Sequence, residues 1–192
     1  MRGRSARVVQ DVLQATIEVL GRQGYAALRV DEVAALAGVN KTTVYRRWPT
    51  KLELVSAAFH EIADRAIVAV DTGSLRSDLL AFFRARSEAS SPARAAMIRL
   101  ITTERANPEV AALARSRWEE HLGRVSALVE RGVDRGELPA GTDAALVAEV
   151  IASASYVRFL QSGQKAEGPF LEAVIDLVLR GAVARPNRED GG

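Results

Sequence analysis

Apolar residues recur at helical spacing along almost the entire chain, and this periodicity constrains the fold more than any other feature of the sequence. In the first such segment the positions i, i+3, i+4, i+7, i+8 and i+11 are Val9, Val12, Leu13, Thr16, Ile17 and Leu20. This spacing places one continuous stripe on one face of a helix. No stretch alternates apolar and polar residues over a useful length, as a half-buried strand would. The sequence therefore predicts an all-α protein.

Glycines and a capping residue divide the first fifty residues into three short helices. The first ends at Gly24, and the second runs over about residues 30–36, with Gly38 just beyond it. Asn40 is a suitable N-cap for a third helix over residues 41–47. Because a tight turn joins the last two helices, the pattern predicts a helix-turn-helix unit.

The remainder of the chain predicts about six more helices. Thr50 and Glu53 have the spacing of a capping box at the start of a helix that reaches about Val70. Pro92 and Pro108 each follow a capping residue and mark the first turn of further helices. The last two helices are expected over residues 143–161 and 169–183, before a disordered tail at residues 185–192.

Positive charge is concentrated in the first third of the chain. Residues 1–60 hold nine Lys and Arg against five Asp and Glu, a net charge of +4, whereas residues 61–192 have a net charge of −2. A basic module attached to a near-neutral body suits a protein that binds a polyanion.

Several other classes of protein are disfavoured. The chain has no Cys, which excludes disulfide scaffolds and thiolate metal sites. Charges interrupt every long apolar run and no signal-peptide core follows the N-terminus, so we expect a cytoplasmic protein that does not cross a membrane. No phosphate-binding loop or catalytic triad pattern is visible, and we expect neither an enzyme nor a cofactor. His60, Glu61 and Asp64 come nearest to a metal site, but a charged solvent face explains them better.

Cationic and hydrogen-bonding side chains crowd onto the predicted third helix. If Val44 faces the two preceding helices, the remaining surface consists of Lys41, Thr42, Thr43, Tyr45, Arg46 and Arg47. Such side chains bond phosphates and base edges when a recognition helix enters the major groove. Lys51, at the N-terminus of the next helix, is expected to help hold a phosphate there. The basic N-terminus (Arg2, Arg4 and Arg7) is either an arm that follows the DNA backbone or a solvated end.

Roughly residues 9–59 resemble the N-terminal domain of TetR-type transcriptional regulators. The similar stretch reads VLQATIEVLGRQGYAALRVDEVAALAGVNKTTVYRRWPTKLELVSAAF. The residues that carry the resemblance are Gly24-Tyr25, Val33-Ala34, Ala37-Gly38-Val39, Lys41, Tyr45 and Lys51. Arg29 departs from it, because the family commonly has Ser or Thr there; this Arg either weakens the cap of the second helix or adds a phosphate contact.

The resemblance also implies roles for these residues and for the body of the protein. It implies phosphate contacts for Thr42, Tyr45 and Lys51, and positions nearer the bases for Lys41, Thr43 and Arg46. We therefore expect a helix-turn-helix DNA-binding domain at residues 1–50 and a ligand-binding and dimerisation domain at residues 51–184. The expected function is a homodimeric repressor that binds a pseudo-palindromic operator in double-stranded DNA until an unidentified small-molecule effector releases it.

Two C-terminal helices are more apolar than a single core-facing stripe requires. The first carries two adjacent stripes, one of Leu146, Val150, Val157 and Leu160 and one of Val147, Ile151 and Ala154. We expect the dimer interface to use Val147, Ile151, Ala154, Leu171, Val174 and Val178. Packing in the core of a monomer is the alternative.

The middle helices are expected to enclose the effector. Candidate lining residues are His60, Phe83, Met97, Ile101, Trp118, Leu122 and Tyr156, with Phe82 and His121 among further candidates. A largely apolar lining favours a hydrophobic or aromatic ligand. The competing hypothesis for the whole chain is a helical protein that binds a small molecule or metal without specific DNA recognition. Duplex affinity that falls steeply with salt distinguishes the two.

Overall fold

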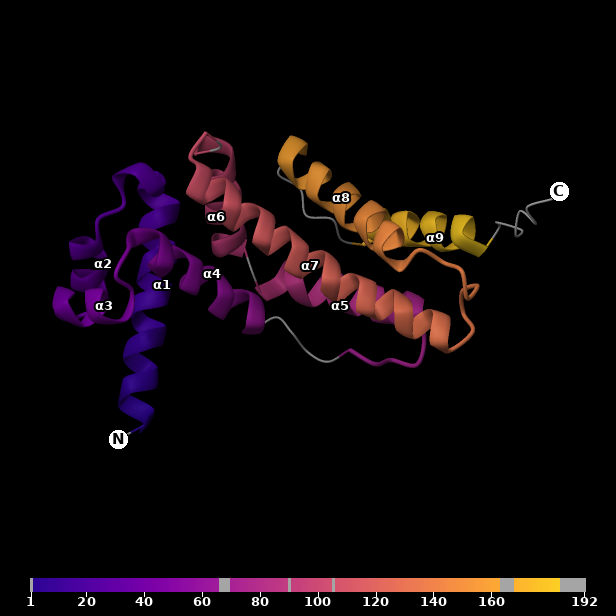
Figure 1. Ribbon diagram of the computed structural model, residues 1–192, viewed down its shortest axis with the longest axis horizontal. Helices are drawn as coiled ribbons and strands as arrows, with labels where there is room; N and C mark the ends of the chain where they lie inside the picture. The colour runs from indigo at the N-terminus through magenta and orange to yellow at the C-terminus, as the bar shows by residue number, and fades with distance from the viewer. Residues whose placement is uncertain (1, 66–69, 90, 105, 163–167, 184–192) are drawn as a thin grey trace. The chain divides into compact units, whose positions relative to one another are not determined.

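The computed structural model describes residues 2–65, 70–89, 91–104, 106–162 and 168–183. Within these residues the chain forms nine α-helices and no strand (Figure 1), which confirms the predicted all-α fold. The helices are α1 Arg2–Ala27, α2 Val30–Leu36, α3 Lys41–Arg47, α4 Lys51–Arg65, α5 Leu75–Ala89, α6 Ser91–Thr103, α7 Pro108–Asp134, α8 Ala144–Ser162 and α9 Pro169–Val183. The predicted disordered tail at residues 185–192 lies outside the described residues.

The first helices begin and end where local capping chemistry predicts. Gly24 has a φ of 79°, a left-handed conformation that glycine adopts at little cost, and it ends the regular part of α1. The Asn40 side chain caps α3 by accepting a 2.9 Å hydrogen bond from the Thr42 backbone N–H. Thr50 Oγ1 accepts a 3.1 Å bond from the Glu53 backbone N–H at the start of α4.

The chain divides into two compact units. The first unit comprises Met1–Ile67 and Glu88–Ser116, and the second comprises Val68–Ser87 and Arg117–Gly192. The helix-turn-helix therefore shares its unit with α4, α6 and the beginning of α7. The predicted boundary between functional domains near residue 50 stays a prediction, because a compact unit is not defined by function.

The core of the first unit forms around α1. This helix packs against α2, α4 and α6. Its predicted stripe is mostly buried, with Val12, Ile17 and Leu20 at its centre. Val44 is fully buried in the same cluster, so the side chain that was expected to hold α3 against the preceding helices does so. The rest of the α3 surface is thereby left for other contacts.

The core of the second unit draws on α5, α7, α8 and α9. Its fully buried members include Leu79, Val129, Ile151, Leu171 and Ile175. α8 packs directly along α9. In this unit each of the four helices thus contributes one apolar face to a common core.

By length and composition alone, α8 could cross a membrane. One 18-residue window has a mean hydropathy of 1.2. The helix nevertheless carries Glu149 and Arg158, and it buries Val147, Ala148, Ile151, Ala152 and Ser155. Because its inner face packs in the core of the second unit, we interpret α8 as a core helix.

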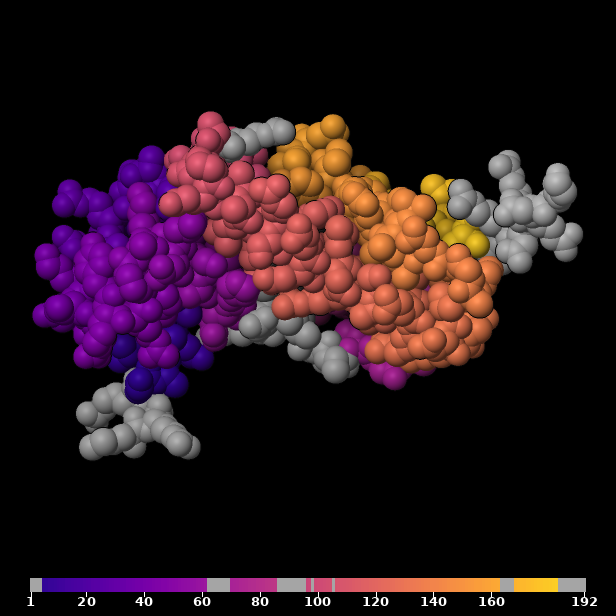
Figure 2. Space-filling model, viewed as in Figure 1, coloured from indigo at the N-terminus to yellow at the C-terminus, as the bar shows by residue number. Residues whose placement is uncertain are grey.

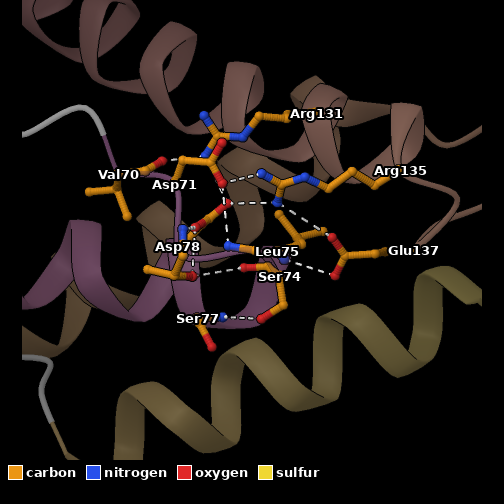
Figure 3. A network of polar contacts seen from close by, with 11 residues as sticks. Val70, Asp71, Ser74, Leu75, Ser77, Asp78, Arg131, Arg135 and Glu137 are labelled. Carbon is orange, nitrogen blue, oxygen red and sulfur yellow. Dashed lines mark hydrogen bonds and ion pairs between the residues drawn. The ribbon is translucent and has the colours of Figure 1, made fainter.

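A polar network joins the start of α5 to the end of α7 within the second unit (Figure 3). At its centre is the carboxylate of Asp78, which is fully buried. Its Oδ1 accepts bonds from Thr72 N (2.6 Å) and Thr72 Oγ1 (2.7 Å). Its Oδ2 accepts bonds from Arg131 Nη2 (2.7 Å) and Arg135 Nη1 (3.1 Å). Four donors thus satisfy a charge that burial would otherwise make costly.

The network also fixes the chain that precedes α5. Arg131 donates to the Val70 carbonyl, and Arg135 pairs with the exposed carboxylate of Asp71. Burial raises the pKa of Asp78, but the bonds from Thr72 and from the two guanidinium groups outweigh burial and lower that pKa from 3.8 to about 2. Asp78 is therefore ionised at neutral pH.

Candidate DNA-binding site

The surface of α3 brings most of the predicted DNA-binding side chains together. Lys41, Thr42, Tyr45, Arg46 and Arg47 are exposed, and Thr43 is half-buried. Figure 2 shows the side chains of the α2–α3 region at the surface of the first unit. Tyr45, with 44% of its surface exposed, presents an unusually accessible aromatic ring for a residue of a packed helix. A short helix with one buried valine and a polar, cationic remainder has the chemistry of a recognition helix.

The cations of α3 are available for a ligand. Among the residues that the structure describes, no carboxylate forms an ion pair with Arg46 or Arg47. The Arg47 guanidinium carbon lies 5.7 Å from the centre of the Trp48 ring. Lys41 Nζ is 3.9 Å from the Asp31 carboxylate, but both side chains are more than half exposed, so this pair contributes little. Phosphates therefore need not displace strong ion pairs to bind α3.

Arg29 occupies the N-cap position of α2 without capping it. Its backbone is extended, and its side chain makes no capping hydrogen bond. Of the two readings that the sequence left open, the weakened cap is thus present in the structure. Because the side chain is exposed, it is also accessible to a phosphate.

Lys51 makes contacts that the sequence did not indicate. Its ammonium donates to the carbonyl oxygens of Tyr25 (2.8 Å) and Ala26 (3.3 Å), and it lies 4.4 Å from the centre of the Tyr25 ring. These carbonyls are at the end of α1, where backbone acceptors lack helical partners. Burial and the nearby carboxylates of Glu109 and Glu104 raise the pKa of Tyr25. Lys51 therefore ties α1 to α4 and has one donor left for a phosphate.

The candidate effector residues fall into both units. Phe83, Trp118, Leu122 and Tyr156 belong to the second unit, whereas His60, Met97 and Ile101 belong to the first. Met97 packs against the core of the first unit. The structure thus does not gather all seven around one place within a single unit.

Aromatic rings do gather in the second unit. His121 stacks on Phe82, with ring centres 5.7 Å apart, and also contacts the rings of Phe83 and Trp118. Trp118 in turn meets Tyr156, with ring centres 5.6 Å apart. This aromatic cluster of Phe82, Phe83, Trp118, His121 and Tyr156 contains three of the seven predicted lining residues and both of the further candidates, Phe82 and His121.

No metal site emerges from the part of the chain that the structure describes: no group of three or more His, Asp or Glu side chains there could hold an ion. His60 and Glu61 lie on α4, and the side chain of Asp64 is outside the described residues.

Most residues of the predicted dimer interface lie at or near the core of the second unit. Val147, Ile151 and Leu171 are buried in the core of the second unit, so they cannot also face a partner subunit unless that core opens. Val174 and Val178 pack partly against the same core, and Ala154 is half-buried. The large apolar side chains that remain exposed on these helices are Leu146, Val150, Val157, Leu160 and Leu177.

Two family models match successive parts of the chain. Residues 12–58 match the model for bacterial regulatory proteins of the tetR family. Residues 69–178 match the model for the tetracyclin repressor-like C-terminal domain. The first match contains the helix-turn-helix with α3, and the second contains most of α5 to α9.

Individual relatives extend over most of the chain. The HTH-type transcriptional regulator AqdR of Rhodococcus erythropolis is 30% identical over 93% of this chain and 86% of its own length. The DNA-binding transcriptional repressor TetR of Mycobacteroides abscessus is 34% identical over 88% of this chain and 90% of its own. The crystal structure of the TetR family transcription regulator SCO0332 superimposes with a TM-score of 0.71 and 26% identity, covering 91% of this chain and 97% of that one.

Proposed function

The chain belongs to the TetR family of bacterial regulatory proteins and is a DNA-binding transcriptional repressor, and we propose that α3 reads its operator through named side chains. Membership of this family implies an operator, a dimer and a small-molecule effector, and it points to a regulator rather than an enzyme. A cytoplasmic location stays a prediction.

The surface of α3 is the observation that carries the proposal. Val44 is fully buried, and α3 turns five exposed polar or cationic residues away from the core. In keeping with the resemblance, we assign Lys41, Thr43 and Arg46 to base edges and Thr42 and Tyr45 to phosphates. We add Arg47 to the phosphate contacts because its side chain is exposed on the same helix. Arg29 and the remaining donor of Lys51 extend the phosphate contacts on either side.

We propose that the repressor is a homodimer joined through the exposed apolar side chains of α8 and α9. Leu146, Val150, Val157 and Leu160 recur on one face of α8, and Leu177 on α9 is 74% exposed. A row of exposed large apolar side chains on one helix face suits an interaction site. A twofold dimer carries two copies of α3 and therefore fits a pseudo-palindromic operator.

The aromatic cluster of the second unit is our candidate for the effector-binding region. A hydrophobic or aromatic compound suits rings with the imidazole of His121 among them. Such an effector releases the DNA only if it binds the released state more tightly than the operator-bound state.

Selection of duplexes from a random DNA pool tests the proposed function. The purified chain should enrich a two-fold-symmetric sequence at near-physiological salt. A folded chain that enriches no sequence, with or without hydrophobic effector candidates, would contradict a sequence-specific repressor. The enriched duplex then serves as the operator in the experiments below.

Replacement of Arg46 by alanine should weaken binding to the selected operator by about 1–3 kcal/mol per subunit and relax its preference at one base pair of each half-site, because a bidentate contact to guanine is lost in both. Titration of a panel of single-base operator variants measures both effects. Arg22→Ala is the matched control, since Arg22 is an exposed α1 residue paired with Glu18. Equal losses on every sequence would instead assign Arg46 to a phosphate.

Replacement of Lys51 by methionine should have two separable effects. Loss of the bonds to the Tyr25 and Ala26 carbonyls should lower the free energy of unfolding by about 1–2 kcal/mol. Loss of the phosphate contact from both subunits of the dimer should reduce the slope of log affinity against log salt by about two. Urea unfolding measures the first effect and salt titrations the second. An unchanged salt slope would mean that Lys51 acts only within the fold.

A further inference from the structure

The first turns of α1 and the last turns of α3 enclose a shallow hollow within the first unit. Its lining residues are Ser5, Val8, Val9, Val12, Thr43, Arg46, Arg47 and Trp48. The α1 residues have the spacing i, i+3, i+4 and i+7 and therefore share one face of that helix. The α3 residues include both arginines of the candidate recognition surface, so the hollow is continuous with that surface.

The lining combines an apolar floor with a cationic rim. Val12 is buried and Val8 and Trp48 are half-buried, whereas Ser5, Arg46 and Arg47 are exposed. No acidic side chain lines the hollow. A ligand that fits this lining has negative oxygens for the guanidinium groups and hydroxyls, and carbon–hydrogen surface for the floor.

We infer that the hollow seats a segment of the operator's sugar–phosphate backbone, and that Ser5 and Val8 are DNA-contacting residues outside the helix-turn-helix. The inference rests on the proposed function, since it places a second contact beside α3. Phosphate oxygens match Arg47 and Ser5 at the rim, where Arg46 borders the base-reading surface, and deoxyribose carbons match the floor. α1 would then fix the register of α3 on the duplex, as phosphate contacts do in other complexes.

Charge substitutions at Ser5 test the inference on the operator selected by the wild-type chain. Ser5→Lys adds one cation at the rim of each subunit, two per dimer, and should make the slope of log affinity against log salt steeper by about 1.8. Affinity should then fall about 12-fold further than for the wild type between about 50 and 200 mM salt. Ser5→Glu should weaken binding and make the slope shallower. Because Ser5 is exposed, neither change disturbs the core.

Gln14 provides the matched control. It is an exposed α1 residue nine positions further along, on the opposite face of the helix. Gln14→Lys and Gln14→Glu make comparable changes in charge and should leave the slope close to that of the wild type. If the substitutions at Ser5 and Gln14 shift the slope equally, or if neither does, the hollow is not a backbone contact, although the repressor still binds its operator. A wild-type chain that selects no duplex would overturn both the inference and the proposed function.

Discussion

Replacement of Asp78 by alanine is expected to lower the free energy of unfolding by about 3–5 kcal/mol, because it leaves two guanidinium groups facing a partly buried position without their carboxylate. Asp78 is fully buried, and all four of its bonds come from Thr72, Arg131 and Arg135. The variant also releases the chain that precedes α5. Urea unfolding followed by circular dichroism measures the loss.

Asp71→Ala is the matched control for Asp78→Ala. Asp71 also pairs with Arg135, but its side chain is 62% exposed, so its removal should cost less than about 1 kcal/mol. Similar losses from the two substitutions would show that burial of the Asp78 carboxylate is not what makes it important.

The pH dependence of stability gives the same variant a second readout. The pKa of Asp78 is lowered from 3.8 to about 2 in the folded chain. The ionised carboxylate therefore contributes fully to the free energy of unfolding above about pH 4, and this contribution is lost as the pH falls toward 2. The wild type should therefore lose about 1–2 kcal/mol over this interval through Asp78, after allowance for screening at the exposed edge of the network. Asp78→Asn should show a shallower decline over that interval.

Local chemistry explains how much of the fold could be predicted from the sequence. A cap such as Asn40 bonds to a backbone N–H two residues away, and a glycine such as Gly24 changes the direction of the chain at its own position. The bounds of α2 and α3 coincide with the predicted ones for this reason. The outward face of α3 could be predicted for the same reason. In a helix this short, one buried valine, Val44, determines which residues face outward.

Contacts between distant residues could not be predicted in this way. Asp78 meets Arg131 and Arg135 across 53 and 57 residues of sequence, and Lys51 meets Tyr25 across 26. No spacing rule links such pairs, so Lys51 was predicted only as a phosphate ligand. The hollow between α1 and α3 was missed for a related reason. Val8, Val9 and Val12 have the periodicity of core residues, and only the fold shows that the same face of α1 forms the floor of a hollow beside α3.

The dimer residues show where periodicity itself is ambiguous. Neighbouring residues on a helix point about 100° apart, so Leu146 and Val147 start two adjacent apolar stripes on α8. The sequence shows both stripes but not which one faces the subunit's own core. Val147 and Ile151, which the sequence suggested for the interface, are buried in that core, whereas Leu146 and Val150 are exposed, so we place the proposed interface on the exposed stripe.

Replacement of Val150 by glutamate is therefore expected to raise the dissociation constant of the dimer by about 100-fold or more. Each subunit would bury an unpaired carboxylate in an apolar contact, and twofold symmetry repeats the cost. Leu177→Glu should have a comparable effect through α9. Because both side chains are exposed in the subunit, its own unfolding free energy should change little. Sedimentation across a range of protein concentrations measures the dissociation constant.

Loss of the dimer should also abolish tight operator binding. A monomer presents one copy of α3 to one half-site, so the affinity for the selected operator should fall by at least about 100-fold, while weak, salt-sensitive binding to any duplex persists. Ala145→Glu is the matched control, because Ala145 is an exposed α8 residue outside the Val150 stripe and receives the same charge.

If Val150→Glu and Leu177→Glu stay dimeric and bind as Ala145→Glu does, the exposed row of α8 and α9 is not the subunit interface. Binding to a pseudo-palindromic operator would then require the two subunits to meet through another surface. A monomeric variant that keeps full operator affinity would instead show that one copy of α3, with the backbone contacts beside it, is sufficient for recognition.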